Sequence, residues 1–221
     1  MRTKLYLAPC GALEDGALFA RALAAVPAAR REKVLRLSGG ARRLSLGAGL
    51  LLRRALAAEG LTAEDYSVDA RGRPCFPSLP DFHFSLSHSG ELAMCAVSAG
   101  PVGCDLERLR ELDVLRLAGR VFHPEENAFL LSLPEAERQA AFFRLWTCKE
   151  SYMKALGLGF ALPMNAFSVS LGGGPALRGA VGGARRFLSF REGAYFCALY
   201  PADAPEDVTL IRTDPVREVT P

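Results

Sequence analysis

Apolar positions in the first quarter of the chain recur at helical spacing. They predict two helices, over residues 13–37 and 41–59, and the second has a broad apolar face. The helix breaker Ser38-Gly39-Gly40 stands between these two segments. Helices are therefore expected to dominate the start of the chain.

The pattern changes to that of strands after Gly72-Arg73-Pro74. Residues 82–87 alternate in part, and residues 92–98 form a short apolar run between glycine-containing turns, which predicts a hairpin. A third strand, over residues 102–107, is expected to follow directly.

The second half repeats the order of helices followed by strands. Helices are predicted over 114–121, 124–133 and 134–156, and strands over 167–171, 186–190, 195–200 and 208–212. The strand at 92–97 is loosely echoed by the strand at 195–200. We therefore expect an α+β fold of two similar halves, residues 1–100 and 101–221.

Composition narrows the class of protein. The 221 residues are half apolar, yet no run approaches the roughly 20 apolar residues of a membrane span, and no targeting segment precedes the fold. The six cysteines form no CxxC pair, which argues against a disulfide framework or a zinc site. A soluble, cytoplasmic protein is expected.

The net charge of +3 is too small to indicate a nucleic-acid binder, but its distribution is uneven. Residues 30–54 hold eight Lys or Arg side chains and a single acidic one, Glu32. Such a block favours anionic ligands or partners. A solvated face of Arg-rich helices is the alternative.

Two acidic residues lie on the predicted strand over residues 102–107. Asp105 and Glu107 are two positions apart, so their carboxylates share one face of the strand and Cys104 and Leu106 share the other. Adjacent like charges repel, and a divalent cation relieves that repulsion. Oxygen ligands without nearby His or Cys favour Mg²⁺ over zinc, although both carboxylates could simply face water.

A third carboxylate lies on the predicted helix over residues 134–156. Trp146, Glu150 and Lys154 recur four residues apart and share a face of this helix. An ordinary helical ion pair between Glu150 and Lys154, with Trp146 in the core, would give the same spacing.

The segment FSLSHSG, residues 84–90, places His88 between two serines at a strand-to-turn junction where an oxyanion could bind. A Ser-His-Asp hydrolase built from Ser87 or Ser89, His88 and Asp105 is one interpretation. It is disfavoured because the chain has no G-x-S-x-G elbow and neighbouring side chains on an extended strand point apart.

Three motifs occur in order: FSLSHSG at 84–90, VGCDLE at 102–107 and WTCKESYMK at 146–154, preceded by GRPCFP at 72–77. Together they resemble the 4'-phosphopantetheinyl transferase superfamily, in particular its monomeric, surfactin-synthetase-activating type. The similarity extends from about residue 30 to residue 169. The ordered pair G-x-D-x-E and W-x-x-K-E-x-x-x-K is far more specific than either motif alone.

This resemblance implies a pseudo-twofold monomer that binds coenzyme A and Mg²⁺ in the cleft between its halves. It implies that Asp105, Glu107 and Glu150 are the metal ligands and that all three serve catalysis. Glu150 is also the candidate general base, although a metal-bound water is the alternative. Lys154, also catalytic, and Lys149 would stabilise the departing 3',5'-ADP.

For coenzyme A itself, the resemblance implies that Ser87 and His88 hold the ligand, with His88 near the 3'-phosphate. Basic residues would surround the adenine and the phosphates, and these are Arg30, Lys33, Arg43 and Arg73. Glu126 matches a further acidic position, expected to hold a metal-bound water or Lys154.

The implied reaction transfers 4'-phosphopantetheine from coenzyme A to a serine of an apo acyl- or peptidyl-carrier protein. A carrier with an acidic helix would dock on a rim at residues 108–120, although this segment could equally be a solvated helix. Fatty acid, polyketide and non-ribosomal peptide synthesis are all compatible. A Mg²⁺-dependent phosphohydrolase and a coenzyme A-binding module without activity are the alternatives, and the retained Glu150 and Lys154 disfavour the second.

Overall fold

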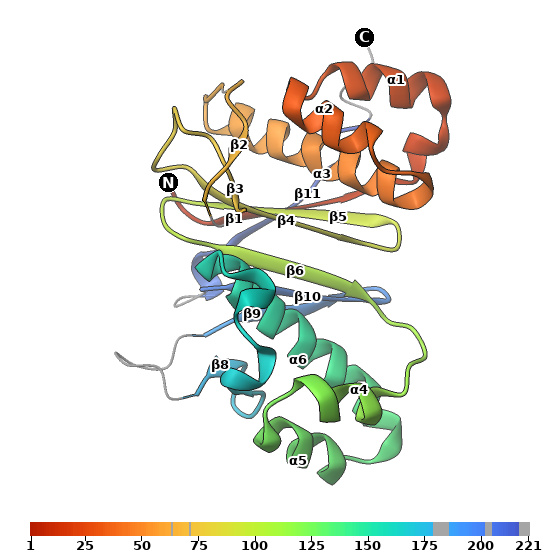
Figure 1. Ribbon diagram of the computed structural model, residues 1–221, viewed down its shortest axis with the longest axis vertical. Coiled ribbons are helices and arrows are strands. Elements are labelled where there is room, and N and C mark those ends of the chain that lie inside the picture. The colour runs from red at the N-terminus through yellow and green to blue at the C-terminus, as the bar shows by residue number, and fades with distance from the viewer. Residues whose placement is uncertain (63, 71, 179–185, 202–204, 217–221) are drawn as a thin grey trace. The chain divides into compact units, whose positions relative to one another are not determined.

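The computed structural model describes residues 1–221 except 63, 71, 179–185, 202–204 and 217–221. The chain forms two compact units (Figure 1). The first comprises Met1–Val102 and the C-terminal segment from Asp207, and the second comprises Gly103–Glu206.

The first unit packs helices on one mostly antiparallel sheet. Its strands lie in the order β11 (Thr209–Arg212), β1 (Lys4–Pro9), β5 (Leu92–Ser98) and β4 (His83–Ser89), with only β11 and β1 parallel. The remaining elements are η1 (Gly11–Glu14), α1 (Gly16–Ala24), α2 (Ala28–Leu35), α3 (Gly39–Ala58), β2 (Ser67–Val68) and β3 (Pro74–Cys75).

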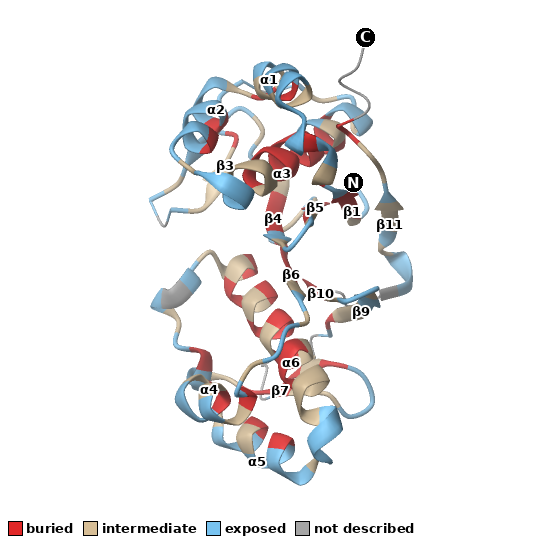
Figure 2. Ribbon diagram, turned by 90° about the vertical axis from the view of Figure 1, so that its right-hand side faces the viewer, coloured by how far each residue is buried: buried red, intermediate tan, exposed pale blue. Residues whose placement is uncertain are grey.

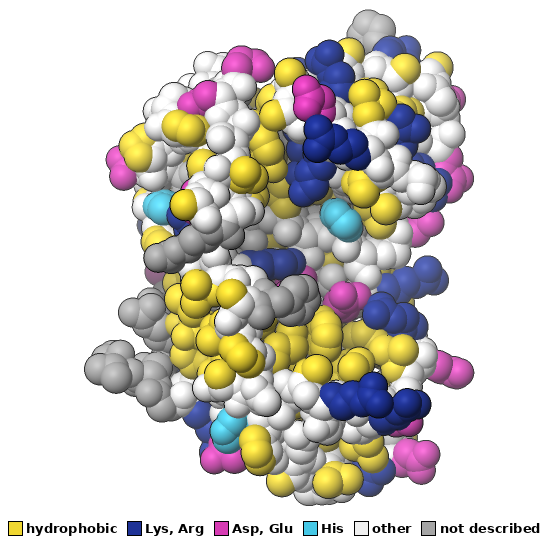
Figure 3. Space-filling view, in the orientation of Figure 1, with side chains coloured by type: hydrophobic (Ala, Val, Ile, Leu, Met, Phe, Trp, Pro, Cys, Tyr) yellow, Lys and Arg dark blue, Asp and Glu magenta, His cyan; other side chains and the backbone are white. Residues whose placement is uncertain are grey.

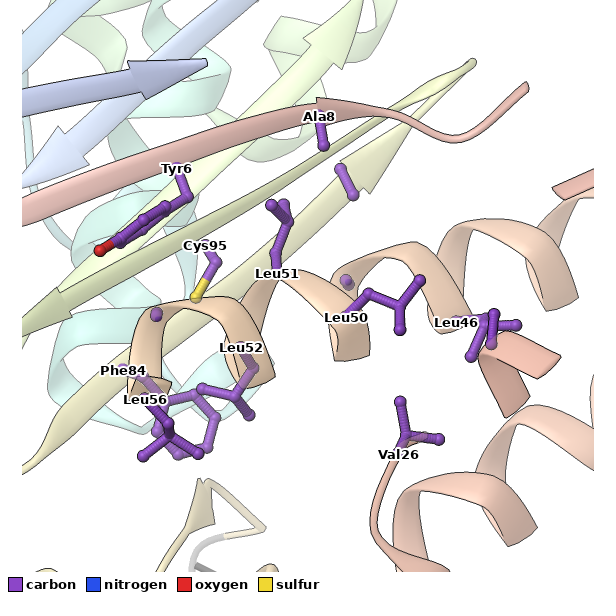
Figure 4. Close-up of a cluster of buried hydrophobic side chains, with 14 of the residues drawn as sticks. Tyr6, Ala8, Val26, Leu46, Leu50, Leu51, Leu52, Leu56, Phe84 and Cys95 are labelled. Atoms are coloured by element: carbon purple, nitrogen blue, oxygen red, sulfur yellow. The ribbon is translucent and has the colours of Figure 1, made fainter. Parts of the chain in front are cut away.

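The core of this unit lies between α3 and the sheet. Leu52 and Leu56 lie beside Phe84, and Leu51 points at the strands that carry Ala8 and Cys95 (Figure 4). The α3 helix buries ten of its twenty residues, because it packs on the sheet and also contacts α2.

The second unit packs one long helix, α6 (Glu135–Leu156), on the antiparallel sheet β6–β10–β9. The strands of this sheet are β6 (Gly103–Arg108), β9 (Leu188–Glu192) and β10 (Tyr195–Tyr200). The other elements are α4 (Val114–Val121), α5 (Pro124–Ser132), η2 (Gly159–Ala161), η3 (Met164–Ala166), β7 (Val169–Ser170), β8 (Ala176–Leu177) and η4 (Pro205–Asp207). Figure 2 shows the buried residues of α6.

The sequence predicted the α+β class correctly, together with the hairpin β4–β5 and helices α4, α5 and α6. The single helix predicted over 13–37 is wrong. Asp15 caps the start of α1 through its side chain, and the extended Pro27 separates α1 from α2. A proline lacks the N–H that a continuous helix would need at this position, so the chain restarts.

The placement of β11 also differs from the sequence-based division. This strand was assigned to a C-terminal half, but Thr209 pairs with Lys4 and Ile211 with Tyr6 at an edge of the first unit's sheet. Such pairing satisfies backbone groups that an open edge would leave exposed, and no local sequence signal selects the partner strand. Among the described residues, no helix is long and apolar enough to cross a membrane.

Candidate functional site

The candidate site begins where β6 lies directly against α6 (Figure 1). A Cβ atom at Gly103 would lie 1.9 Å from the backbone oxygen of Ser151 and 2.5 Å from the backbone nitrogen of Ala155. Only glycine permits so close an approach of the strand to the helix backbone. This contact explains the glycine of the G-x-D-x-E motif, because it brings the following strand residues close to α6.

Asp105 is the first acidic residue of β6, and it contacts α6 through Lys154. The Asp105 side chain is almost fully buried, and Lys154 Nζ donates a hydrogen bond to its Oδ1 at 2.6 Å. Burial favours the neutral form of Lys154, but Asp105, Cys104 and Glu150 together outweigh it and raise the pKa of this amine. Lys154 therefore stays charged beside the carboxylate.

Glu107 lies two residues further along β6 and is less buried than Asp105. It pairs with Arg110 at 3.2 Å, across the end of the strand. Arg110 lies within the predicted carrier rim, residues 108–120, and its spacing of three residues from Glu107 is the sequence signal for this ion pair.

Glu150 projects from α6 four residues before Lys154. Its pKa is raised to about 7, first by burial and then by the charges of Asp105 and Glu107, which Lys154 opposes in part. Its Oε1 atom is buried and accepts no hydrogen bond from the described residues. Such a carboxylate can accept a proton near neutral pH, and its environment favours an added cation.

The three predicted metal ligands thus lie in one unit and influence one another electrostatically. In the part of the chain that the structure describes, however, no three His, Cys, Asp or Glu side chains gather closely enough to hold a metal ion. Lys154 and Arg110 contact two of the three carboxylates instead. The donor set is all oxygen and suits Mg²⁺ chemically, so the magnesium site stays a prediction.

Lys149 does not have the position expected of a ligand-binding cation. Its side chain has no exposed surface, and Nζ donates to Glu126 Oε1 and to the backbone oxygen of Phe167, each at 2.7 Å. The rings of Phe167 and Phe122 lie 4.1 and 5.7 Å from this nitrogen. The ammonium of Lys149 is thus enclosed by protein groups in this structure, and its predicted contact with coenzyme A stays a prediction.

Glu126, which was expected to hold a metal-bound water or Lys154, binds Lys149 in this structure. Besides Lys149, its Oε1 accepts the backbone N–H of Val169 at 2.7 Å, and its Oε2 accepts that of His123 at 2.9 Å. The second bond belongs to a capping box at the start of α5. Glu126 is thus a buried structural carboxylate.

The predicted coenzyme A-binding residues of the first unit differ in exposure. Lys33 is exposed. Ser87 is buried and His88 is exposed, as expected for adjacent residues whose side chains lie on opposite faces of a strand. Arg43 pairs with Glu14 at 3.0 Å and Arg73 with Asp69 at 3.3 Å, and both keep about a third of the side chain exposed. Lys and Arg side chains gather over α2 and α3 (Figure 3).

Arg30 is the exception within this basic set. It is 4% exposed, and its guanidinium donates to the backbone oxygen of Ser45 at 2.7 Å. A Cβ atom at Gly49 would lie 3.2 Å from the Arg30 side chain, so the guanidinium fits tightly between α2 and α3. In this structure the Arg30 side chain joins two helices, and its predicted contact with coenzyme A stays a prediction.

The predicted carrier rim follows β6. Arg108, Arg110, Arg116 and Arg120 are exposed, whereas Leu115 and Leu117 pack in part on the core. A hollow of about 690 Å³ lies between residues 111–115 and 135–139. Its lining includes Glu111, Asp113 and Glu135, so the hollow itself does not complement an acidic partner.

An α+β fold that places a carboxylate of raised pKa, Glu150, near the charged Lys154 has an arrangement typical of acid–base enzymes. A model of the 4'-phosphopantetheinyl transferase superfamily matches residues 101–200, which contain this site. A Bacillus subtilis 4'-phosphopantetheinyl transferase is 37% identical over 155 residues, covering 68% of this chain and 69% of the relative. The chain therefore belongs to the 4'-phosphopantetheinyl transferase superfamily.

Two further relatives align over shorter regions. The transferase Sfp of Bacillus subtilis strain 168 is 41% identical over 106 residues, 48% of this chain and 47% of the relative. The transferase HetI of Nostoc is 41% identical over 129 residues, 54% of each chain. The chain thus matches about half the length of these two relatives.

Proposed function

We propose that this enzyme transfers 4'-phosphopantetheine from coenzyme A to a serine of an apo acyl- or peptidyl-carrier protein. The observation that carries the proposal is the arrangement of Glu150, Asp105 and Lys154 on β6 and α6. These residues lie in the segment that matches the transferase superfamily. A proton acceptor beside a fixed cation suits phosphoryl transfer, where positioning and charge neutralisation supply most of the catalysis.

In this reaction the carrier serine Oγ forms a bond to the β-phosphorus of coenzyme A. The bond from that phosphorus to the bridging oxygen breaks, and 3',5'-ADP leaves with the electron pair. Glu150 is the candidate acceptor of the serine proton, because its Oε1 accepts no hydrogen bond from the described residues. A cation bound beside Glu150 would lower its pKa below the value of about 7 and weaken it as a base. Lys154, held by Asp105, stabilises the negative charge on the leaving phosphate.

A Mg²⁺ ion held by Asp105, Glu107 and Glu150 would neutralise the charge of the diphosphate. Burial raises the pKa of Glu150 most, and repulsion from Asp105 and Glu107 raises it further; this repulsion supports a cation at this position. Lys154 pairs with Asp105 and Arg110 with Glu107, so the ion would share these two carboxylates with both side chains.

Coenzyme A would be held by the exposed Lys33 and His88, by Ser87, and by Arg43 and Arg73, whose side chains are about one third exposed. The carrier would meet the exposed arginines of residues 108–120, which complement an acidic helix. The enzyme would act as a cytoplasmic monomer in fatty acid, polyketide or non-ribosomal peptide synthesis, without nucleic-acid or membrane partners.

The proposal is tested by incubating the protein with coenzyme A, Mg²⁺ and an apo carrier protein, and by weighing the intact carrier. The carrier should gain one phosphopantetheine only when Mg²⁺ is present. Glu150→Gln should abolish the gain, whereas Glu137→Gln, an exposed position on the same helix, should not. Consumption of coenzyme A with an unmodified carrier would instead indicate a phosphohydrolase, and binding of coenzyme A without reaction would indicate a binding module.

A further inference from the structure

The ion pair of Glu126 and Lys149 is the most buried pair in the described part of the chain, with side chains 1% and 0% exposed. It joins three segments of the second unit. Lys149 belongs to α6, Glu126 to the first turn of α5, and the backbone groups they bind belong to Phe167 and Val169 around β7.

A pair in this position does little for stability compared with apolar side chains of the same size. Both charges lose their hydration on burial. Their mutual attraction and the surrounding hydrogen bonds together only compensate that loss. What the pair provides is a fixed geometry, because each hydrogen bond has a required direction. The α6 helix is thereby held at Lys149 against α5 and β7.

The next residue on α6 is Glu150, and Lys154 follows one turn later. Neighbouring helical residues point about 100° apart, so Lys149 faces α5 and β7 while Glu150 lies in the field of Asp105. Any rotation or shift of α6 at Lys149 would move Glu150 relative to Asp105 on β6. The buried pair therefore controls the position of the site carboxylates without touching the reacting groups.

We propose that Glu126 and Lys149 are positioning residues, which set the placement of Glu150 and Lys154 and make no contact with coenzyme A. This inference rests on the proposed function. It differs from the role in stabilising 3',5'-ADP that the sequence motif suggests for Lys149.

The test uses the double variant Glu126→Gln/Lys149→Met of the full chain. It removes both charges together, and the glutamine oxygen can still accept the Val169 N–H. Lys149→Met alone would leave a buried carboxylate without its cation and lower the folding equilibrium constant several hundred-fold. The matched control is Glu125→Gln/Arg178→Met, a neighbouring pair at 3.3 Å with side chains more than half exposed.

For the positioning role, kcat for carrier modification should fall about 10- to 100-fold in the double variant, since small misplacements are costly in catalysis. The Kd for coenzyme A, measured by calorimetry, should stay within about threefold, as expected when no direct contact is lost. The control pair should leave both values unchanged. A Kd raised tenfold or more would show that Lys149 binds the nucleotide, and an unchanged kcat would show that the pair only supports the fold; either result overturns the proposal.

A measurement on the wild-type protein keeps the proposal falsifiable if the double variant does not fold. The side-chain ammonium of Lys149 should give an NMR signal protected from exchange with water, both without and with saturating coenzyme A. Loss of that protection on adding coenzyme A would mean that Lys149 leaves Glu126 for the ligand, which refutes the inference. A wild-type protein that modifies no carrier would contradict the proposed function instead, independently of this signal.

Discussion

Gly103→Ala tests the close contact between β6 and α6 on which the site depends. The new Cβ would lie 1.9 Å from the Ser151 backbone oxygen, and ordinary contact begins at 3.4 Å, so strand and helix must separate by about 1.5 Å. Both partners are backbone atoms of regular elements and cannot move away alone. We expect a loss of about 3 kcal/mol in the free energy of unfolding, at the upper end of overpacking penalties.

The same displacement would disturb the site directly. Added to the 2.6 Å between Lys154 Nζ and Asp105 Oδ1, a separation of about 1.5 Å breaks this hydrogen bond. A misplacement of this size lowers catalytic rates by about 100-fold. Gly103→Ala should therefore lower both stability and carrier modification.

Thermal unfolding followed by circular dichroism would show the stability change as a fall in Tm of about 6–12 °C for a chain of this size. Gly119→Ala is the matched control, because a Cβ atom there meets no atom within 4 Å, and alanine should stabilise α4 by about 0.5–1 kcal/mol. A Gly103→Ala protein with the Tm and activity of the wild type would refute the argument that this glycine sets the approach of β6 to α6.

Three further predictions concern single residues. Of the six free cysteines only Cys75 is not buried, and burial raises the pKa of the Cys10 thiol to about 12. A thiol reagent at pH 8 should therefore label the folded protein once and the Cys75→Ser variant not at all. Labelling of two or more thiols would contradict this prediction. Backbone N–H groups of α1 donate to Asp15 and hold its pKa below 3.8. The ionised Asp15 therefore stabilises α1 fully above pH 3.8, and this stabilisation is lost as the pH falls through the lower pKa of the folded protein. An NMR titration of Asp15 with a midpoint at or above 3.8 would disprove the prediction. Phe142→Ala removes a ring 1% exposed and should lower the free energy of unfolding by about 3–5 kcal/mol in urea denaturation, whereas a loss under 1 kcal/mol would mean that the site refills.

Periodicity alone predicted which side chains share a face. The two-residue spacing of Asp105 and Glu107 placed them correctly on one side of β6, and the four-residue spacing placed Glu150 and Lys154 together on α6. These are local properties of a strand and a helix. The motifs in that order also indicated the superfamily to which the chain belongs.

What lies opposite each face was decided by the tertiary structure. Asp105 meets Lys154 across 49 residues of sequence, Lys149 is enclosed beside Glu126, and Arg30 joins α2 to α3. Periodicity gives the direction of a side chain but not its neighbour, so a basic residue in a motif can be a ligand contact or a buried structural cation. That difference depends on long-range packing and burial, which no local spacing encodes.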